Sequence, residues 1–263
     1  MVSLICEFPN GIERYLISVS YRKKKVKSLC ARQELPVEGT GDRTDAVSEE
    51  KIIRREIIAL CQKLHDRNLL AAADGNVSFR LSDEKILITP SGKNKAFLQE
   101  DEIAVVNLAN DVLQGEPSSE RLMHLELYRY CPKALAVIHA HPPTAIAWTI
   151  ARPTLEELPC ESLSEIILAA GRIPIVRYAR PGTVAMGRHL EPFLPGHRIL
   201  ILSRHGAITW GESLLEAYNG MERLEHSARI LKAAHELGGL HALPSEEVQV
   251  LRRMRKEKGE RLL

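Results

Sequence analysis

Short apolar runs alternate with segments of helical spacing along most of the chain. The runs are rich in Ile, Leu and Val and predict buried strands at residues 85–89, 103–108, 134–140, 173–178 and 198–203. Apolar positions three or four apart predict helices at residues 48–64, 119–130, 161–170 and 213–237, and a charged helix from residue 245 onward. Strands that alternate with helices are typical of an α/β domain.

The length of one connection fixes the direction of two strands. Residues 77–80 and 86–88 are joined by a link too short to hold a crossover helix, so they must form a hairpin. The sheet is therefore at least partly antiparallel, which disfavours a purely doubly wound fold.

The first 46 residues differ from the rest of the chain. A basic run, YRKKKVK at residues 21–27, is followed by PVEGTGDRTD at residues 36–45, whose Gly and charged residues are typical of a linker. The first helix then begins, with Ser48 as its expected N-cap. We expect a flexible N-terminal extension over residues 1–46 and one main domain over residues 47–263.

Composition narrows the class of protein and its partners. An apolar fraction of 44% with 27% charged residues is ordinary for a soluble globular chain. Lys plus Arg number 36 and Asp plus Glu 34, so the net charge gives no reason to expect nucleic acid or an anionic membrane as a partner.

Cysteine usage and the apolar runs indicate a compartment. The five cysteines stand far apart and form no CxxC motif, which argues against a disulfide framework or a thiolate zinc site. No apolar run approaches the ~18–20 residues that cross a bilayer, and the N-terminus lacks the apolar region of a signal peptide. We therefore expect a cytoplasmic protein with reduced thiols.

Two histidines stand at the end of the predicted strand 134–140, in the sequence AVIHAHPP. Residues two apart on a strand project to the same face, so His139 and His141 would hold their imidazoles side by side. His205 follows another apolar strand, and the adjacent Gly206 lets a backbone or ligand come close. Three imidazoles at strand ends match a catalytic site for zinc or another divalent ion with an open position. Spacing alone also allows a simpler alternative, in which these histidines are only hydrogen-bonded.

The helix before this strand begins in the sequence PSSERLMHLELY. We expect Ser118 or Ser119 as its N-cap and Glu120 in its first turn. One interpretation is capping alone, in which the Glu120 carboxylate complements the helix dipole. In the other, the hydroxyls and free amides bind a phosphate, while Glu120 faces the metal as a ligand or general acid/base. The sequence leaves both open.

Two further loops have the composition of anion-binding turns. Gly75 and Asn76 in DGNVS readily take turn conformations, and Ser91 and Gly92 in TPSGKNK expose backbone amides beside two lysines. Glycine turns between strands are common, so only their combination with the histidines favours a role in ligand binding.

In combination, these segments resemble the class II aldolase/adducin family from about residue 48 to the mid-230s. The resemblance rests on six motifs in the same order, GNVSFR (75–80), ITPSG (88–92), SSE (118–120), HAH (139–141), YARPGT (178–183) and RHGAITWG (204–211). It implies a three-layer α/β/α fold with a mainly antiparallel central sheet. It also implies a homotetramer with the active site near a subunit boundary.

The resemblance assigns roles to individual residues. It implies metal ligation, with Zn²⁺ or another divalent transition metal as the expected ion, by His139, His141 and His205. Glu120 would be the catalytic acid/base and a further candidate ligand. Substrate phosphate would be bound by Asn76, Ser91, Gly92, Ser118 and Ser119.

The activity implied is that of a metal-dependent aldolase, a lyase acting on a sugar phosphate or aldehyde substrate. The metal would stabilise the enediolate released when a C–C bond of a short phosphorylated ketose breaks, and Glu120 would move the proton. The same chemistry serves the family's pentulose-phosphate epimerases and methylthioribulose-phosphate dehydratases. A non-catalytic adducin-like interaction module is a third alternative.

The sequence departs from the family's aldolases at positions that help complete their site. No tyrosine occurs in residues 159–168 or after Tyr218, and Ala73 stands where the aldolase pattern has a phosphate-binding Thr. The resemblance therefore does not fix the substrate.

Overall fold

The computed structural model describes residues 42–262, and its centre is one mixed sheet. The sheet has eight strands in the order β4-β3-β2-β1-β5-β8-β7-β6, and only β6 and β7 run parallel. The strands are β1 Asn76–Ser82, β2 Lys85–Ile88, β3 Ala104–Val106, β4 Val112–Gln114, β5 Ala136–Ala140, β6 Ile175–Val176, β7 Ile199–Leu202 and β8 Gly206–Gly211. The prediction of a mainly antiparallel sheet is confirmed.

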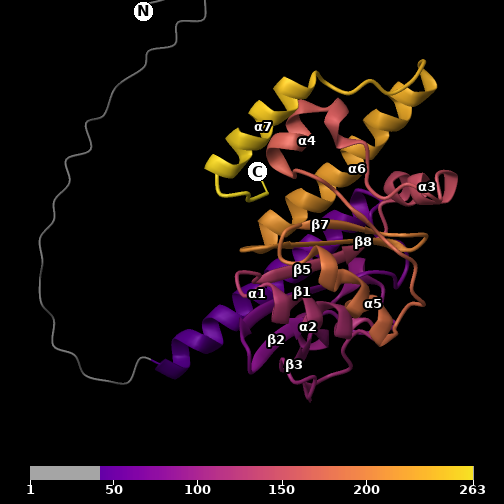
Figure 1. The fold of residues 1–263 in the computed structure, drawn as a ribbon. Coiled ribbons are helices and arrows are strands. Elements are labelled where there is room, and N and C mark those ends of the chain that lie inside the picture. The colour runs from indigo at the N-terminus through magenta and orange to yellow at the C-terminus, as the bar shows by residue number, and fades with distance from the viewer. Residues whose placement is uncertain (1–41, 263) are drawn as a thin grey trace, which may run out of the picture. The chain divides into compact units, whose positions relative to one another are not determined.

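Helices cover both faces of the sheet (Figure 1). The α-helices are α1 Asp42–Asp66, α2 Arg121–Tyr130, α3 Pro143–Ala151, α4 Ser164–Ala169, α5 Val184–Leu190, α6 Leu214–Glu236 and α7 Ser245–Glu257. Four short 3₁₀ turns add to them, η1 Lys95–Phe97, η2 Glu100–Glu102, η3 Cys160–Ser162 and η4 Glu191–Phe193. None of the helices within residues 42–262 is long and apolar enough to cross a membrane.

Two apolar clusters on opposite faces of the sheet hold the three layers together. Alternate residues of β5 divide between them, with Ile138 in the cluster under α1, α3 and α6, and Val137 in the cluster under α2 and α5. β7 divides in the same way, with Ile201 on the first face and Leu200 on the second. A strand buried on both faces is therefore apolar throughout, as the continuous apolar runs predicted. The three-layer α/β/α prediction is confirmed.

The structure corrects the predicted start of the first helix. α1 begins at Asp42, so Ser48 lies inside the helix and is not its N-cap. Residues 42–47 contain no Gly or Pro, and nothing in them prevents the helix from continuing upstream of Ser48. Residues 1–41 lie outside the described part of the chain, and the flexible extension stays a prediction.

Candidate metal centre

Three histidines from two separate segments converge at one end of the central strands. His139 lies in β5, His141 directly follows that strand, and His205 lies in the turn between β7 and β8. β8 pairs with β5 so that His139 is opposite Ile208, which brings the turn next to the end of β5. One ligand atom from each of the three histidines lies within 4.8 Å of the others. The predicted convergence of these histidines is therefore confirmed.

The outer ring nitrogens show which atoms would bind an ion. Nδ1 of His139 donates to the carbonyl of Ala207 at 2.9 Å, and Nδ1 of His141 lies 3.5 Å from a carboxylate oxygen of Asp74. A neutral ring with its proton on Nδ1 has its lone pair on Nε2. The Nε2 atoms of His139 and His141 face each other at 3.2 Å. Converging lone pairs with outer nitrogens held by acceptors suit a divalent transition metal, so the residues fit the expected ion.

Glu120 adds a carboxylate to the same point. Its two oxygens lie 3.3 Å from Nε2 of His139 and 3.3 Å from Nε2 of His205, and one of them accepts a hydrogen bond from the Asn76 amide at 3.0 Å. The prediction of Ser118 or Ser119 as N-cap is wrong, because Glu120 itself is the N-cap of α2. Its side chain caps no helix amide, since it points to the histidines instead. The interpretation of Glu120 as a capping residue alone therefore fails.

The ionisation of these groups favours a cation between them. Burial, followed by repulsion from the other imidazoles, lowers the pKa of His141 to about 4 and that of His205 to about 4. Burial alone would raise the pKa of Glu120, but the hydrogen bond and charge of His139, then the charge of His205 and the Asn76 amide, lower it to about 2. At neutral pH the site therefore presents the neutral imidazoles of His141 and His205 and the ionised carboxylate of Glu120.

Lys95 fixes the segment at residues 73–75, next to the histidines, a role that the sequence did not reveal. Lys95 is 2% exposed, and its ammonium donates to the carbonyls of Ala73 at 2.9 Å and Lys93 at 2.6 Å. Gly75 follows with a positive φ of 70°, and a Cβ there would lie 2.8 Å from the carbonyl oxygen of His139. Only glycine lets this segment approach β5 so closely. The sequence identified Lys95 only as one of two lysines beside Ser91 and Gly92, and its burial could not be predicted because it depends on packing against residues distant in the chain.

The predicted phosphate-binding residues lie on neighbouring segments. Backbone hydrogen bonds join Ser118 to Thr89 at 3.1 Å and Ser91 to Glu116 at 3.0 Å, so the turn after β2 lies beside the segment that leads into α2. Ser91, Gly92 and Ser119 are exposed, whereas Ser118 is buried. Asn76 opposes His139 across β1 and β5, and its buried amide is bonded to Glu120. Their phosphate role stays a prediction.

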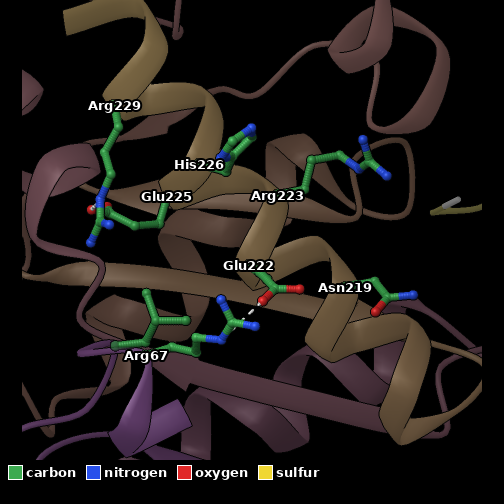
Figure 2. Close-up of a pocket in the computed structure, with 8 residues that line it drawn as sticks. Arg67, Asn219, Glu222, Arg223, Glu225, His226 and Arg229 are labelled. Atoms are coloured by element: carbon green, nitrogen blue, oxygen red, sulfur yellow. Dashed lines mark hydrogen bonds and ion pairs between the residues drawn. The ribbon is translucent and has the colours of Figure 1, made fainter. Parts of the chain in front are cut away.

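A cavity of about 510 Å³ lies beside α6 (Figure 2). Its lining comes from the end of α1 and from α6 and includes three arginines, of which Arg67 lies 3.4 Å from Glu222 and Arg229 lies 2.7 Å from Glu225. None of the three histidines lines it. Glu225 also accepts hydrogen bonds from the first amides of α3, Thr144 at 2.9 Å and Ala145 at 3.2 Å. The cavity wall thus supports the chain directly after His141.

Comparisons with known proteins agree with this geometry. Residues 55–231 match the family described as Class II Aldolase and Adducin N-terminal domain. L-fuculose phosphate aldolase of Methanococcus vannielii is 36% identical over 176 residues, which are 67% of this chain and 93% of that protein. 3-Oxo-tetronate 4-phosphate decarboxylase of Escherichia coli strain CFT073 is 31% identical over 194 residues, 72% of this chain and 90% of that protein.

A solved structure extends the likeness to three dimensions. YgbL of Escherichia coli superimposes with a TM-score of 0.72 at 28% identity, over 77% of this chain and 99% of that one. Because the similar proteins are named as aldolases and decarboxylases, this chain is an enzyme of the same broad type. It belongs to the class II aldolase and adducin family.

Proposed function

We propose that this protein is a metal-dependent lyase that breaks or forms a C–C bond next to the carbonyl group of a short phosphorylated ketose. The observation that carries the proposal is the convergence of three Nε2 atoms and the Glu120 carboxylate at one point. Three imidazole ligands suit zinc with the fourth position left for substrate, and the Glu120 carboxylate lies beside that position. A binding module has no evident need for it, which disfavours the adducin-like interaction module.

Different side chains would hold the ion and move the proton. His139, His141 and His205 would hold the divalent ion, which when bound stabilises negative charge on neighbouring substrate oxygens. When the C–C bond breaks, its electron pair stays on the carbon next to the carbonyl, and that carbon then needs a proton. Glu120 lies beside the three histidines and is ionised at neutral pH, so it can accept a substrate proton and return it to this carbon.

The segments around the start of α2 are the proposed phosphate site. Ser91, Gly92, Ser118 and Ser119 lie where two loops meet the N-terminal end of this helix. The dipole of α2 favours an anion at its N-terminal end. Binding the phosphate away from the reacting carbons would serve to orient the substrate.

A second candidate follows from the named relatives. A decarboxylase that acts on a 3-oxo acid, like an aldolase, leaves an electron pair on the carbon next to a carbonyl. Several similar proteins are named 3-oxo-tetronate 4-phosphate decarboxylase. The same ion and the same Glu120 would serve this reaction, whereas no observation specifically favours the epimerase or the dehydratase.

The experiment is a substrate panel with a matched pair of variants. Zinc-loaded protein is incubated with dihydroxyacetone phosphate and small aldehydes, with phosphorylated 3-oxo acids and with pentulose phosphates, and the products are identified by mass. Glu120→Gln should lower the rate by about 10²–10⁴-fold. Glu126→Gln, on the same helix but paired with Arg129, should stay close to wild type. A Glu120→Gln variant as active as wild type would rule out this mechanism.

A further inference from the structure

A chain of buried polar side chains runs from the far end of α2 to Glu120. Tyr128 and His124 lie one turn apart on α2, and Ser78 and Asn76 lie two apart on β1, so each pair shares one face of its element. The Tyr128 hydroxyl is 2.8 Å from the Ser78 hydroxyl, which is 2.7 Å from Nδ1 of His124. Nε2 of His124 contacts the Asn76 amide oxygen, and the amide nitrogen is 3.0 Å from Glu120. The first four side chains are at most 2% exposed.

The ionised carboxylate of Glu120 sets the direction of the hydrogen bonds in this series of side chains. An ionised carboxylate only accepts, so the Asn76 amide must donate to Glu120, which turns its oxygen toward His124. Nε2 of His124 must therefore donate. Nδ1 of this neutral ring then has no proton and must accept from Ser78. The Ser78 oxygen can then accept from the Tyr128 hydroxyl at 2.8 Å, although this hydroxyl also lies 3.3 Å from the carbonyl oxygen of Leu135, a competing acceptor for its one proton.

His124 therefore has the opposite tautomer from its neighbour at the metal centre. His139 donates through Nδ1 to the carbonyl of Ala207, whereas His124 donates through Nε2. Burial, with repulsion from His139, lowers the pKa of His124 to about 3. The His124 ring therefore stays neutral at physiological pH, and the order of donors and acceptors in these hydrogen bonds does not reverse.

We propose that His124 is a positioning residue: its Nε2 proton fixes the Asn76 amide so that Asn76 holds one oxygen of Glu120 and leaves the other to exchange a proton. The held oxygen is Oε2, which also lies nearest His139, and the remaining one is Oε1 beside His205. This inference rests on the proposed function only for the role of Glu120. The order of donors and acceptors follows from side-chain chemistry alone.

The first test uses two variants of similar size and polarity. The amide of His124→Gln can still reach and donate to Asn76, whereas the shorter His124→Asn cannot. Zn²⁺ affinity is measured by competition with a chromophoric chelator, and thermal unfolding shows that each variant is folded. His124→Asn should bind zinc about 10–100-fold more weakly, as for other residues behind a metal site. His124→Gln and the exposed control His241→Gln should stay close to wild type. Equal affinities of the two His124 variants would overturn the proposal.

A second measurement uses wild-type protein, so its result depends neither on the folding of a variant nor on zinc binding. Long-range ¹H–¹⁵N spectra of wild-type protein at pH 7 distinguish a protonated from a bare ring nitrogen. We expect His124 to carry its proton on Nε2 and His139 on Nδ1. A proton on Nδ1 of His124, or a charged ring, would overturn the inference even if zinc binds normally. If zinc does not bind but this pattern is found, the proposed function fails and the hydrogen-bond chain stands.

Discussion

At the scale of single residues, the site is held by contacts between neighbouring imidazole rings and by hydrogen bonds between residues far apart in the chain. The two-residue spacing of His139 and His141 predicted imidazoles side by side, and the structure confirms this with ring centroids 5.0 Å apart, although His141 lies just past the end of β5. The contacts of Asn76 with Glu120 and of Lys95 with Ala73 could not be predicted in this way. They join residues 44 and 22 positions apart, and nothing local to either residue identifies its partner. Hydrogen-bond partners across a fold depend on packing rather than on spacing.

His124 predicts an acid-dependent loss of stability. Its folded-state pKa of about 3 is below the 6.5 of an unfolded chain, so its contribution is fully present above pH 6.5 and is lost as pH falls toward 3. Between pH 7 and pH 5, we expect the unfolding free energy of metal-free wild-type protein to fall by about 2 kcal/mol more than that of His124→Gln. The glutamine side chain has no group that titrates in this range. Urea unfolding at both pH values measures this. Equal losses would contradict a buried neutral imidazole at this position.

At the scale of elements, the order of strands places the metal centre. β5 lies between β1 and β8, so Asn76, His139 and the turn carrying His205 meet at one edge. Apolar runs predicted β2, β3, β5, β6 and β7, but helices α3 and α5 and strands β4 and β8 were not predicted. α3 is apolar on nearly every side, which hides its helical period, and its N-cap and first residue are a proline pair. β8 is bounded by glycines and has a threonine in its centre, so it lacks a continuous apolar run.

Gly206 should be essential for the close packing of β8 against the histidines. A Cβ there would lie 2.6 Å from the carbonyl oxygen of Ala140 and 2.8 Å from the rings of His139 and His141. We expect Gly206→Ala to cost about 1–3 kcal/mol of unfolding free energy and to weaken zinc binding. Gly196→Ala is the control, because its added Cβ would make only an ordinary 3.7 Å contact. Denaturant unfolding and chelator competition measure both effects, and a Gly206→Ala variant that matches the control would refute this packing role.

At the scale of the whole molecule, the three-layer fold and the family agree with what the motifs implied. The six motifs are distributed over residues 75–211, and the family match covers residues 55–231. The substrate could not be predicted, because positions that complete the site in the family's aldolases differ here. The homotetramer stays a prediction, since the structure describes one chain. The flexible extension predicted over residues 1–46 stays a prediction for residues 1–41, which lie outside the described residues, whereas residues 42–46 belong to α1.

The metal content of the purified protein tests the central claim most directly. Elemental analysis of the untagged chain should find about one divalent transition metal, with zinc the expected ion, per polypeptide. The double variant His139→Ala and His141→Ala should lose that metal, while a control double variant of the exposed His226 and His241 keeps it. The account predicts that the metal is lost only when His139 and His141 are replaced. A wild-type chain without metal, or a His139→Ala and His141→Ala double variant with undiminished metal, would contradict it.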